Sequence, residues 1–137
     1  MDQRNKRIGF LGCGQMAQAI MQGLLSSDYD PNMIYASDRD EEKLQQFAKE
    51  TGIQPRTNET LIEDVEVLVL AVKPQVLDYL LPTLHPELAK FTGLIISIAA
   101  GRTLAQLTNL LGEEEHAVLR TVPNTPALVH EGLTALT

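Results

Sequence analysis

The chain has 137 residues, which suits one domain of ordinary size, and 44% of them are hydrophobic, enough for a core. The formal net charge of −7 argues against a general nucleic-acid surface. It leaves phosphorylated small ligands open, because backbone amides at a helix N-terminus bind phosphate without net positive charge. The one cysteine, Cys13, excludes an internal disulfide and a Cys-rich zinc site and favours a reducing cytoplasm.

Two further classes of protein are excluded by residue spacing. The three histidines show no metal-ligand spacing, so we expect no metal site. No stretch approaches the roughly 18 consecutive apolar residues of a membrane-spanning helix.

Apolar runs that suit strands alternate along the chain with segments of helical periodicity. In chain order, the expected strands cover residues 7–11, 33–37, 53–56, 65–72, 94–98 and 117–122, with one more beginning at 133–137. The expected helices cover residues 15–25, 41–50, 57–64 (a short helix or turn), 75–81 and 103–111. Gly52 and Gly112 are expected to end two of them, Thr103 to cap the last, and Pro82 and Pro86 to interrupt the fourth.

This alternation predicts an α/β domain of the Rossmann type, a doubly wound and mostly parallel sheet with helices on both faces. The nearly continuous apolar run over 65–72 supports it, because a parallel strand covered on both faces has no polar side. The chain ends inside the strand-like segment 133–137, so we expect it to be the first part of a longer protein. The alternative is a complete small protein whose last strand pairs at a sheet edge.

A glycine motif follows the first expected strand and opens the first expected helix. Gly12, Gly14 and Ala17 match the dinucleotide-binding pattern G-x-G-x-x-A. The first glycine permits a tight turn, the second lets a pyrophosphate approach the backbone, and the alanine allows close helix–strand packing. The N-terminus of the helix then offers free N–H groups to the pyrophosphate. The motif therefore predicts a dinucleotide site, although a turn that merely needs glycine would share part of the pattern.

The choice of cofactor depends on Ser37, Asp38 and Arg39 at the end of the second expected strand. An acid at this position usually holds the adenosine ribose and selects NAD, whereas an arginine beside a hydroxyl suits a 2′-phosphate. Asp38 lies 26 positions after Gly12, beyond the usual spacing of about 20. We therefore favour Ser37 and Arg39 as a phosphate clamp. The alternative is a polar turn in which Asp38 caps the helix that begins near Asp40.

Three other segments follow expected strands at the same sheet edge. Residues 71–75 follow the buried fourth strand, which lies beside the first in the usual doubly wound order, so Lys73 could approach the cofactor or simply be solvated. The small residues 97–101 leave room for a flat ring or for close packing. Residues 123–126 form a stiff loop that could hold a carboxylate or be an ordinary turn. Asn58 could reach the adenosine or cap a helix.

Taken together, these stretches resemble the pyrroline-5-carboxylate reductase family from residue 7 to residue 137. The most specific motifs are GCGQMA at 12–17, LAVKPQ at 70–75, SIAAG at 97–101 and RTVPNTPA at 120–127, the last followed by Glu131 and Gly132. The resemblance implies the last step of proline biosynthesis, in which NADPH or NADH gives a hydride to the cyclic imine of 1-pyrroline-5-carboxylate to form L-proline. NADPH is the favoured cofactor, with NADH possible.

The resemblance also implies the site residues. The pyrophosphate is expected on Leu11, Gly12, Cys13, Gly14, Gln15 and Met16. The adenosine phosphate is expected on Ser37 and Arg39, with Asn58 near the adenosine. The ribose and nicotinamide are expected beside Ala71, Val72, Lys73, Pro74, Ala99 and Ala100. The substrate pocket is expected to include Pro123, Asn124 and Thr125.

Members of the family are longer and carry a second, helical domain that forms an intertwined dimer and completes the substrate site. We therefore expect the full-length protein to form a homo-oligomer, and residues 1–137 to bind cofactor but reduce the imine poorly. No residue here is predicted as a general acid. One alternative is another reductase of the superfamily, such as an NADP-dependent deazaflavin oxidoreductase. The other is a non-catalytic nucleotide-sensing module.

Overall fold

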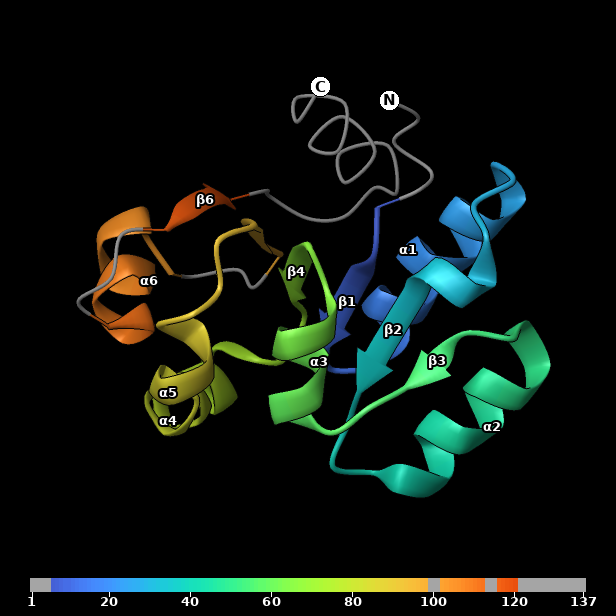
Figure 1. The fold of residues 1–137 in the computed structure, drawn as a ribbon. Helices are drawn as coiled ribbons and strands as arrows, with labels where there is room; N and C mark the ends of the chain where they lie inside the picture. The colour runs from blue at the N-terminus through green and yellow to red at the C-terminus, as the bar shows by residue number, and fades with distance from the viewer. Residues whose placement is uncertain (1–5, 99–101, 113–115, 121–137) are drawn as a thin grey trace.

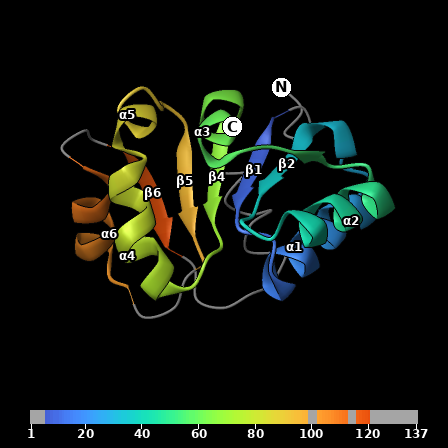
Figure 2. The same ribbon diagram turned by 90° about the horizontal axis from the view of Figure 1, so that it is seen from below.

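The computed structural model describes residues 6–98, 102–112 and 116–120, and these form one six-stranded sheet with helices on both faces. The strand order is β3-β2-β1-β4-β5-β6, and every pairing is parallel. The strands are β1 (Ile8–Leu11), β2 (Ile34–Ser37), β3 (Gln54–Pro55), β4 (Val67–Leu70), β5 (Leu94–Ser97) and β6 (Ala117–Arg120). Figure 1 shows the fold, and Figure 2 shows the strands side by side from β6 to β2. The predicted Rossmann-type fold is confirmed.

The helices connect successive strands. They are α1 (Gln15–Ser26), the 3-10 turn η2 (Pro31–Met33), α2 (Glu41–Thr51), α3 (Asn58–Asp64), α4 (Pro74–Thr83), α5 (His85–Leu88) and α6 (Leu104–Leu111). Within the described ranges, no helix is long and apolar enough to cross a membrane.

Two apolar cores lie on the two faces of the sheet, because successive strand residues point in opposite directions. In β4, Val67 and Val69 belong to the core that α1 and α2 cover, whereas Leu68 and Leu70 belong to the core under α3, α4 and α6. All four side chains are fully buried. This double burial explains why the sequence of this strand shows no polar alternation.

The predicted helix ends are largely confirmed. Gly52 ends α2 in a left-handed conformation with φ of +87°, as glycine readily does. Thr103 caps α6, where its side chain accepts the N–H of Gln106.

Proline does not interrupt the fourth helix where we predicted. Pro82 lies inside α4, which continues to Thr83, and Pro86 lies at the start of α5. Pro82 is tolerated because it stands in the last turn, where its missing N–H removes one intrahelical bond just before the helix ends. The expected strand at 133–137 lies outside the described residues.

Candidate cofactor-binding site

The predicted pyrophosphate site lies where the carboxyl ends of three neighbouring strands meet. Leu11 at the end of β1 is in register with Ser37 of β2 and with Leu70 of β4. Backbone bonds continue past the strands: the N–H of Gly12 donates to the carbonyl of Ser37 at 2.9 Å, and the N–H of Ala71 donates to that of Leu11 at 2.9 Å. The loops after β1, β2 and β4 are therefore fixed to one another, at the edge where doubly wound folds bind ligands.

The two glycines of the motif have different environments. Gly12 has φ of +106°, and a Cβ there would lie 2.8 Å from Cγ1 of Val72 and 3.1 Å from the carbonyl carbon of Ala71. Gly14 has φ of −78°, which any residue adopts, and a Cβ there would meet nothing within 4 Å. The described protein atoms therefore give a reason for glycine at position 12 and none at position 14. The open space beside Gly14 fits the approach of a pyrophosphate.

The N-terminus of α1 faces this open space without a protein cap. Gly14 stands at the N-cap, no side chain bonds the first turn, and the first turn carries no acidic residue. Gln15 and Met16 are exposed, whereas Ala17 is buried against the sheet as the motif predicts. Unpaired helix N–H groups and the positive end of the helix dipole suit an anionic group.

Val72, Lys73 and Pro74 border the loop on the β4 side. The Val72 side chain packs against Gly12, Pro74 begins α4, and Lys73 is exposed at the helix N-cap. The loop after β4 therefore stands beside the glycine loop, as the predicted strand order required.

A hollow of about 460 Å³ lies next to the glycine loop, at the carboxyl ends of β2 and β3. It brings together three residues predicted for the adenosine side: Ser37 and Arg39 from the end of β2, and Asn58 from the start of α3. Arg39 is exposed, and no described residue forms a hydrogen bond or ion pair with its side chain. Ser37 is only 1% exposed, and its Oγ has no hydrogen-bond partner among the described residues. Arg39 is thus the more accessible half of the predicted phosphate clamp.

A second arginine lines this hollow and was not predicted. Arg56 follows β3, donates to Oδ2 of Asp64 at 3.0 Å, and stacks on the ring of Tyr35, 4.9 Å from its centroid. Its guanidinium is already engaged, so it shapes the wall of the hollow more than it offers a free charge. Its position at the end of the expected strand over 53–56, close to Asn58, was the signal in the sequence.

Asp38 does not cap α2, the alternative role that we weighed for it. Its Oδ2 accepts the N–H of Cys13 at 2.8 Å, its Oδ1 accepts the N–H of Asp40 at 2.8 Å, and Nζ of Lys43 lies 3.3 Å from Oδ2. The residue that caps α2 is Asp40, whose side chain accepts the N–H of Lys43. Burial alone would raise the pKa of Asp38, but the two N–H bonds and the lysine outweigh it and hold that pKa below its usual value.

Cys13 is buried inside the loop, which supports the interpretation of a small residue that fills a tight turn. Burial, and next the Asp38 carboxylate, raise the pKa of its thiol, although Lys43 and Gln18 act in the opposite direction. A raised pKa disfavours the thiolate, which is the nucleophilic form of cysteine.

Comparison with known proteins agrees with this geometry. The family described as NADP oxidoreductase, coenzyme F420-dependent, matches residues 7–101. The chain belongs to this family. Pyrroline-5-carboxylate reductase of Escherichia coli (strain K12) is 36% identical over 134 residues, which are 96% of this chain and 49% of that protein.

Solved structures of two reductases are also similar. The pyrroline-5-carboxylate reductase of Coxiella burnetii is 34% identical with a TM-score of 0.80, over 90% of this chain and 46% of that one. The Plasmodium falciparum pyrroline carboxylate reductase with NADP bound is 28% identical with a TM-score of 0.74, over 92% of this chain and 45% of that one. The chain therefore spans about half the length of the reductases that it matches.

Five predicted residues of this family member lie outside the described ranges. These are the two beside the nicotinamide and the three of the substrate pocket: Ala99, Ala100, Pro123, Asn124 and Thr125. Within those ranges, no group of three His, Cys, Asp or Glu residues could hold a metal ion.

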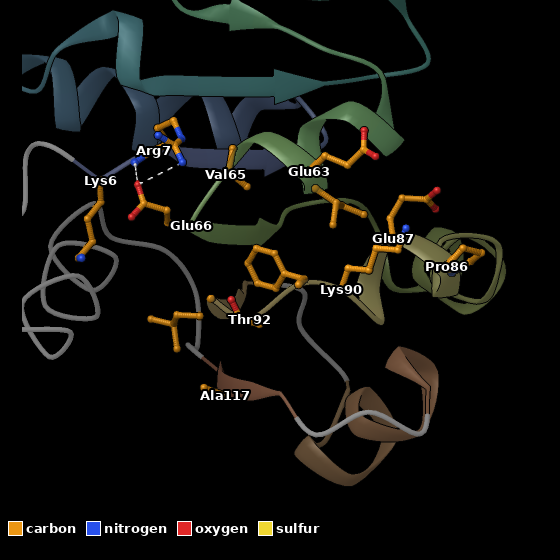
Figure 3. Close-up of a pocket in the computed structure, with 14 residues that line it drawn as sticks. Lys6, Arg7, Glu63, Val65, Glu66, Pro86, Glu87, Lys90, Thr92 and Ala117 are labelled. Carbon is orange, nitrogen blue, oxygen red and sulfur yellow. Dashed lines mark hydrogen bonds and ion pairs between the residues drawn. The ribbon is translucent and has the colours of Figure 1, made fainter.

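A larger hollow, of about 730 Å³, lies at the opposite edge, where β1, β4 and β5 begin (Figure 3). Three carboxylates line it, those of Glu63, Glu66 and Glu87, and the Glu66 carboxylate accepts the backbone N–H of Arg7 at 3.1 Å. Lys6, Arg7 and Lys90 line it as well, so the formal charges of the lining cancel, and among the described residues no helix of eight or more residues begins in it. The carboxyl edge is therefore the better cofactor site, despite its smaller hollow.

Proposed function

We propose that this chain is the cofactor-binding domain of a pyrroline-5-carboxylate reductase that uses NADPH. The observation that carries the proposal is similarity to a named reductase over 96% of the chain, joined to a glycine loop whose second glycine faces open space. That open space is what a bound pyrophosphate needs. A turn that needed glycine for packing alone would have protein atoms there.

The cofactor would lie across the carboxyl edge of the sheet. The free N–H groups at the start of α1 would hold the pyrophosphate, and the hollow beyond β2 would receive the adenosine. Arg39 would pair with a 2′-phosphate, which only NADPH carries, with Ser37 and Asn58 beside it. Ala71, Val72, Lys73 and Pro74 would border the ribose and nicotinamide. When bound, the cofactor supplies the hydride, and these residues bind and orient it.

The substrate of the whole protein would be the cyclic imine 1-pyrroline-5-carboxylate, reduced to L-proline. Pro123, Asn124 and Thr125 stay predicted for its carboxylate, and Ala99 and Ala100 for the nicotinamide side. Since the chain spans about half of its relatives' length, we propose that a helical dimerisation domain completes the substrate pocket. The single cysteine favours the cytoplasm as its location.

The test is a calorimetric titration of the chain with NADPH and with NADH. We expect tighter binding of NADPH, and we expect Arg39→Ala to weaken NADPH roughly tenfold, the loss of one charge-assisted contact, while NADH changes little. Lys49→Ala is the matched control, because it removes an exposed positive charge from the far end of α2. An equal loss of NADPH affinity in both variants would mean that Arg39 acts only through the overall charge of the protein. Absence of binding to either cofactor would contradict the proposal.

Turnover separates this proposal from a second candidate, which the family description supplies by naming coenzyme F420. NADPH oxidation is measured with 1-pyrroline-5-carboxylate, and NADP reduction is measured with reduced coenzyme F420. We expect the imine to be the substrate of the whole protein, and this chain alone to turn it over poorly. Brisk F420-dependent turnover would favour the second candidate.

A further inference from the structure

Asp38 stands at the end of β2, where a carboxylate usually receives the ribose hydroxyls of NAD. Here the protein already occupies both of its oxygens. Oδ2 accepts the N–H of Cys13 and Oδ1 accepts the N–H of Asp40, both at 2.8 Å. The side chain is only 12% exposed. Asp38 also lines the hollow in which the adenosine would lie, but each of its oxygens already accepts a backbone N–H of the protein.

The bond to Cys13 reaches the middle of the glycine loop. Cys13 lies between Gly12, which needs its positive φ, and Gly14, which faces the open space. Among the described residues, the N–H of Cys13 donates to Asp38, a residue 25 positions away. One carboxylate therefore ties the β1–α1 loop to the β2–α2 turn.

Lys43 makes this arrangement compatible with a phosphate nearby. Its Nζ lies 3.3 Å from Oδ2 of Asp38, so a positive charge offsets the carboxylate that would otherwise repel a 2′-phosphate. Arg39, the next residue along the chain, is exposed and carries its charge into the hollow. Both neighbours line the hollow, but the Asp38 carboxylate is bonded to the protein, whereas no described residue forms a hydrogen bond or ion pair with the Arg39 side chain.

We propose that Asp38 is a positioning residue that holds the glycine loop in its pyrophosphate-binding shape, and that the bonds of its carboxylate within the protein leave recognition of the adenosine end to Arg39. The inference rests on the proposed cofactor function. It predicts different roles for the two residues: Asp38 affects the affinities for NADPH and NADH equally, whereas Arg39 sets the ratio of the two affinities.

The experiment is a calorimetric titration of the wild type, Asp38→Asn and Arg39→Ala with NADPH and NADH. Asparagine keeps the size of the side chain but has an NH2 donor in place of one oxygen, so one of the two N–H groups, which bond different oxygens of Asp38, loses its acceptor. We expect Asp38→Asn to weaken both cofactors by a similar factor, roughly tenfold, with their ratio unchanged. Loss of NADH affinity alone, with NADPH unchanged or tighter, would mean that Asp38 serves the ribose and would overturn the inference.

Lys43→Gln is the matched control. It removes the ion pair but leaves the two backbone bonds of Asp38, so we expect the NADH dissociation constant to stay within about twofold of the wild type, and any loss to fall on NADPH, whose 2′-phosphate would lie near an uncompensated carboxylate. A loss of NADH affinity as large as that of Asp38→Asn would assign the effect to charge balance and overturn the positioning role.

A measurement without cofactor keeps this inference separate from the proposed function. Hydrogen exchange of the Cys13 amide, followed by NMR, is expected to be faster in Asp38→Asn than in the wild type. Unchanged exchange overturns the inference, even if the chain binds NADPH. If the variant does not fold, the wild type is titrated toward acid. The amide shifts of Cys13 and Asp40 are then expected to share one midpoint, and separate midpoints overturn the inference.

Discussion

Replacement of Gly14 by alanine separates what the glycine loop does for the fold from what it does for a ligand. The φ of −78° and ψ of −174° at Gly14 are open to any residue, and the new Cβ would meet no protein atom within 4 Å. Alanine is a poorer N-cap than glycine by about 1 kcal/mol, but it loses less backbone entropy on folding, by about 0.4–1 kcal/mol. We therefore expect the free energy of unfolding to change by less than about 1 kcal/mol, which moves Tm by a few degrees.

The same methyl group occupies the space through which a pyrophosphate would reach the start of α1. We expect NADPH to bind about a hundredfold more weakly, since at least one charge-assisted bond to the loop is lost, at about 1.5–3 kcal/mol, and the steric overlap adds to that loss. Thermal unfolding and calorimetric titration of the same preparation measure the two effects together.

Gly12→Ala is the matched control within the same loop. Its φ of +106° and the 2.8 Å approach of a Cβ to Cγ1 of Val72 strain the folded state. We expect a loss of roughly 1–3 kcal/mol of stability there. The reasoning is refuted if Gly14→Ala destabilises the chain as much as Gly12→Ala does. It is also refuted if Gly14→Ala binds NADPH as well as the wild type.

Three other predictions concern stability. Gly93→Ala places a Cβ 1.9 Å from the carbonyl oxygen of Glu66, so β5 must shift from β4; we expect a loss of about 3 kcal/mol or more in urea denaturation, and an unchanged midpoint would contradict this close approach. Leu68→Ala empties a fully buried position of β4 and is expected to cost about 2–5 kcal/mol, whereas a loss below 1 kcal/mol would contradict its burial. The lowered pKa of Asp38 means that its contribution is present above the ordinary value of 3.8 and is lost as the pH falls through the folded-state pKa. The stability difference between the wild type and Asp38→Asn should therefore be constant from about pH 5 to about pH 8 and shrink only in stronger acid; a change near neutral pH would contradict the ion-paired, hydrogen-bonded carboxylate.

Much of the fold could be predicted because the signals are local. The apolar run of β4 predicts a buried strand without knowledge of the neighbouring strands. The helix caps at Thr103 and Gly52 depend only on residues within one turn. The interruption predicted at Pro82 was wrong because α4 continues to Thr83 although Pro82 has no N–H to donate, so the exact end of a helix is not set by the proline alone.

The sequence by itself determined the glycine loop, the segments that follow the strands and the alternation of strands and helices. Each of these is a pattern of residues that are close together along the chain. The partners of polar side chains at the sheet edge were decided only by the tertiary structure. Asp38 faces Cys13, Ser37 is buried and Arg56 is engaged by Asp64. These outcomes depend on the directions of side chains from strands and loops that the parallel pairing brings together. The sequence of a short polar turn does not determine which way its side chains point, because their partners belong to a neighbouring loop that is distant in sequence.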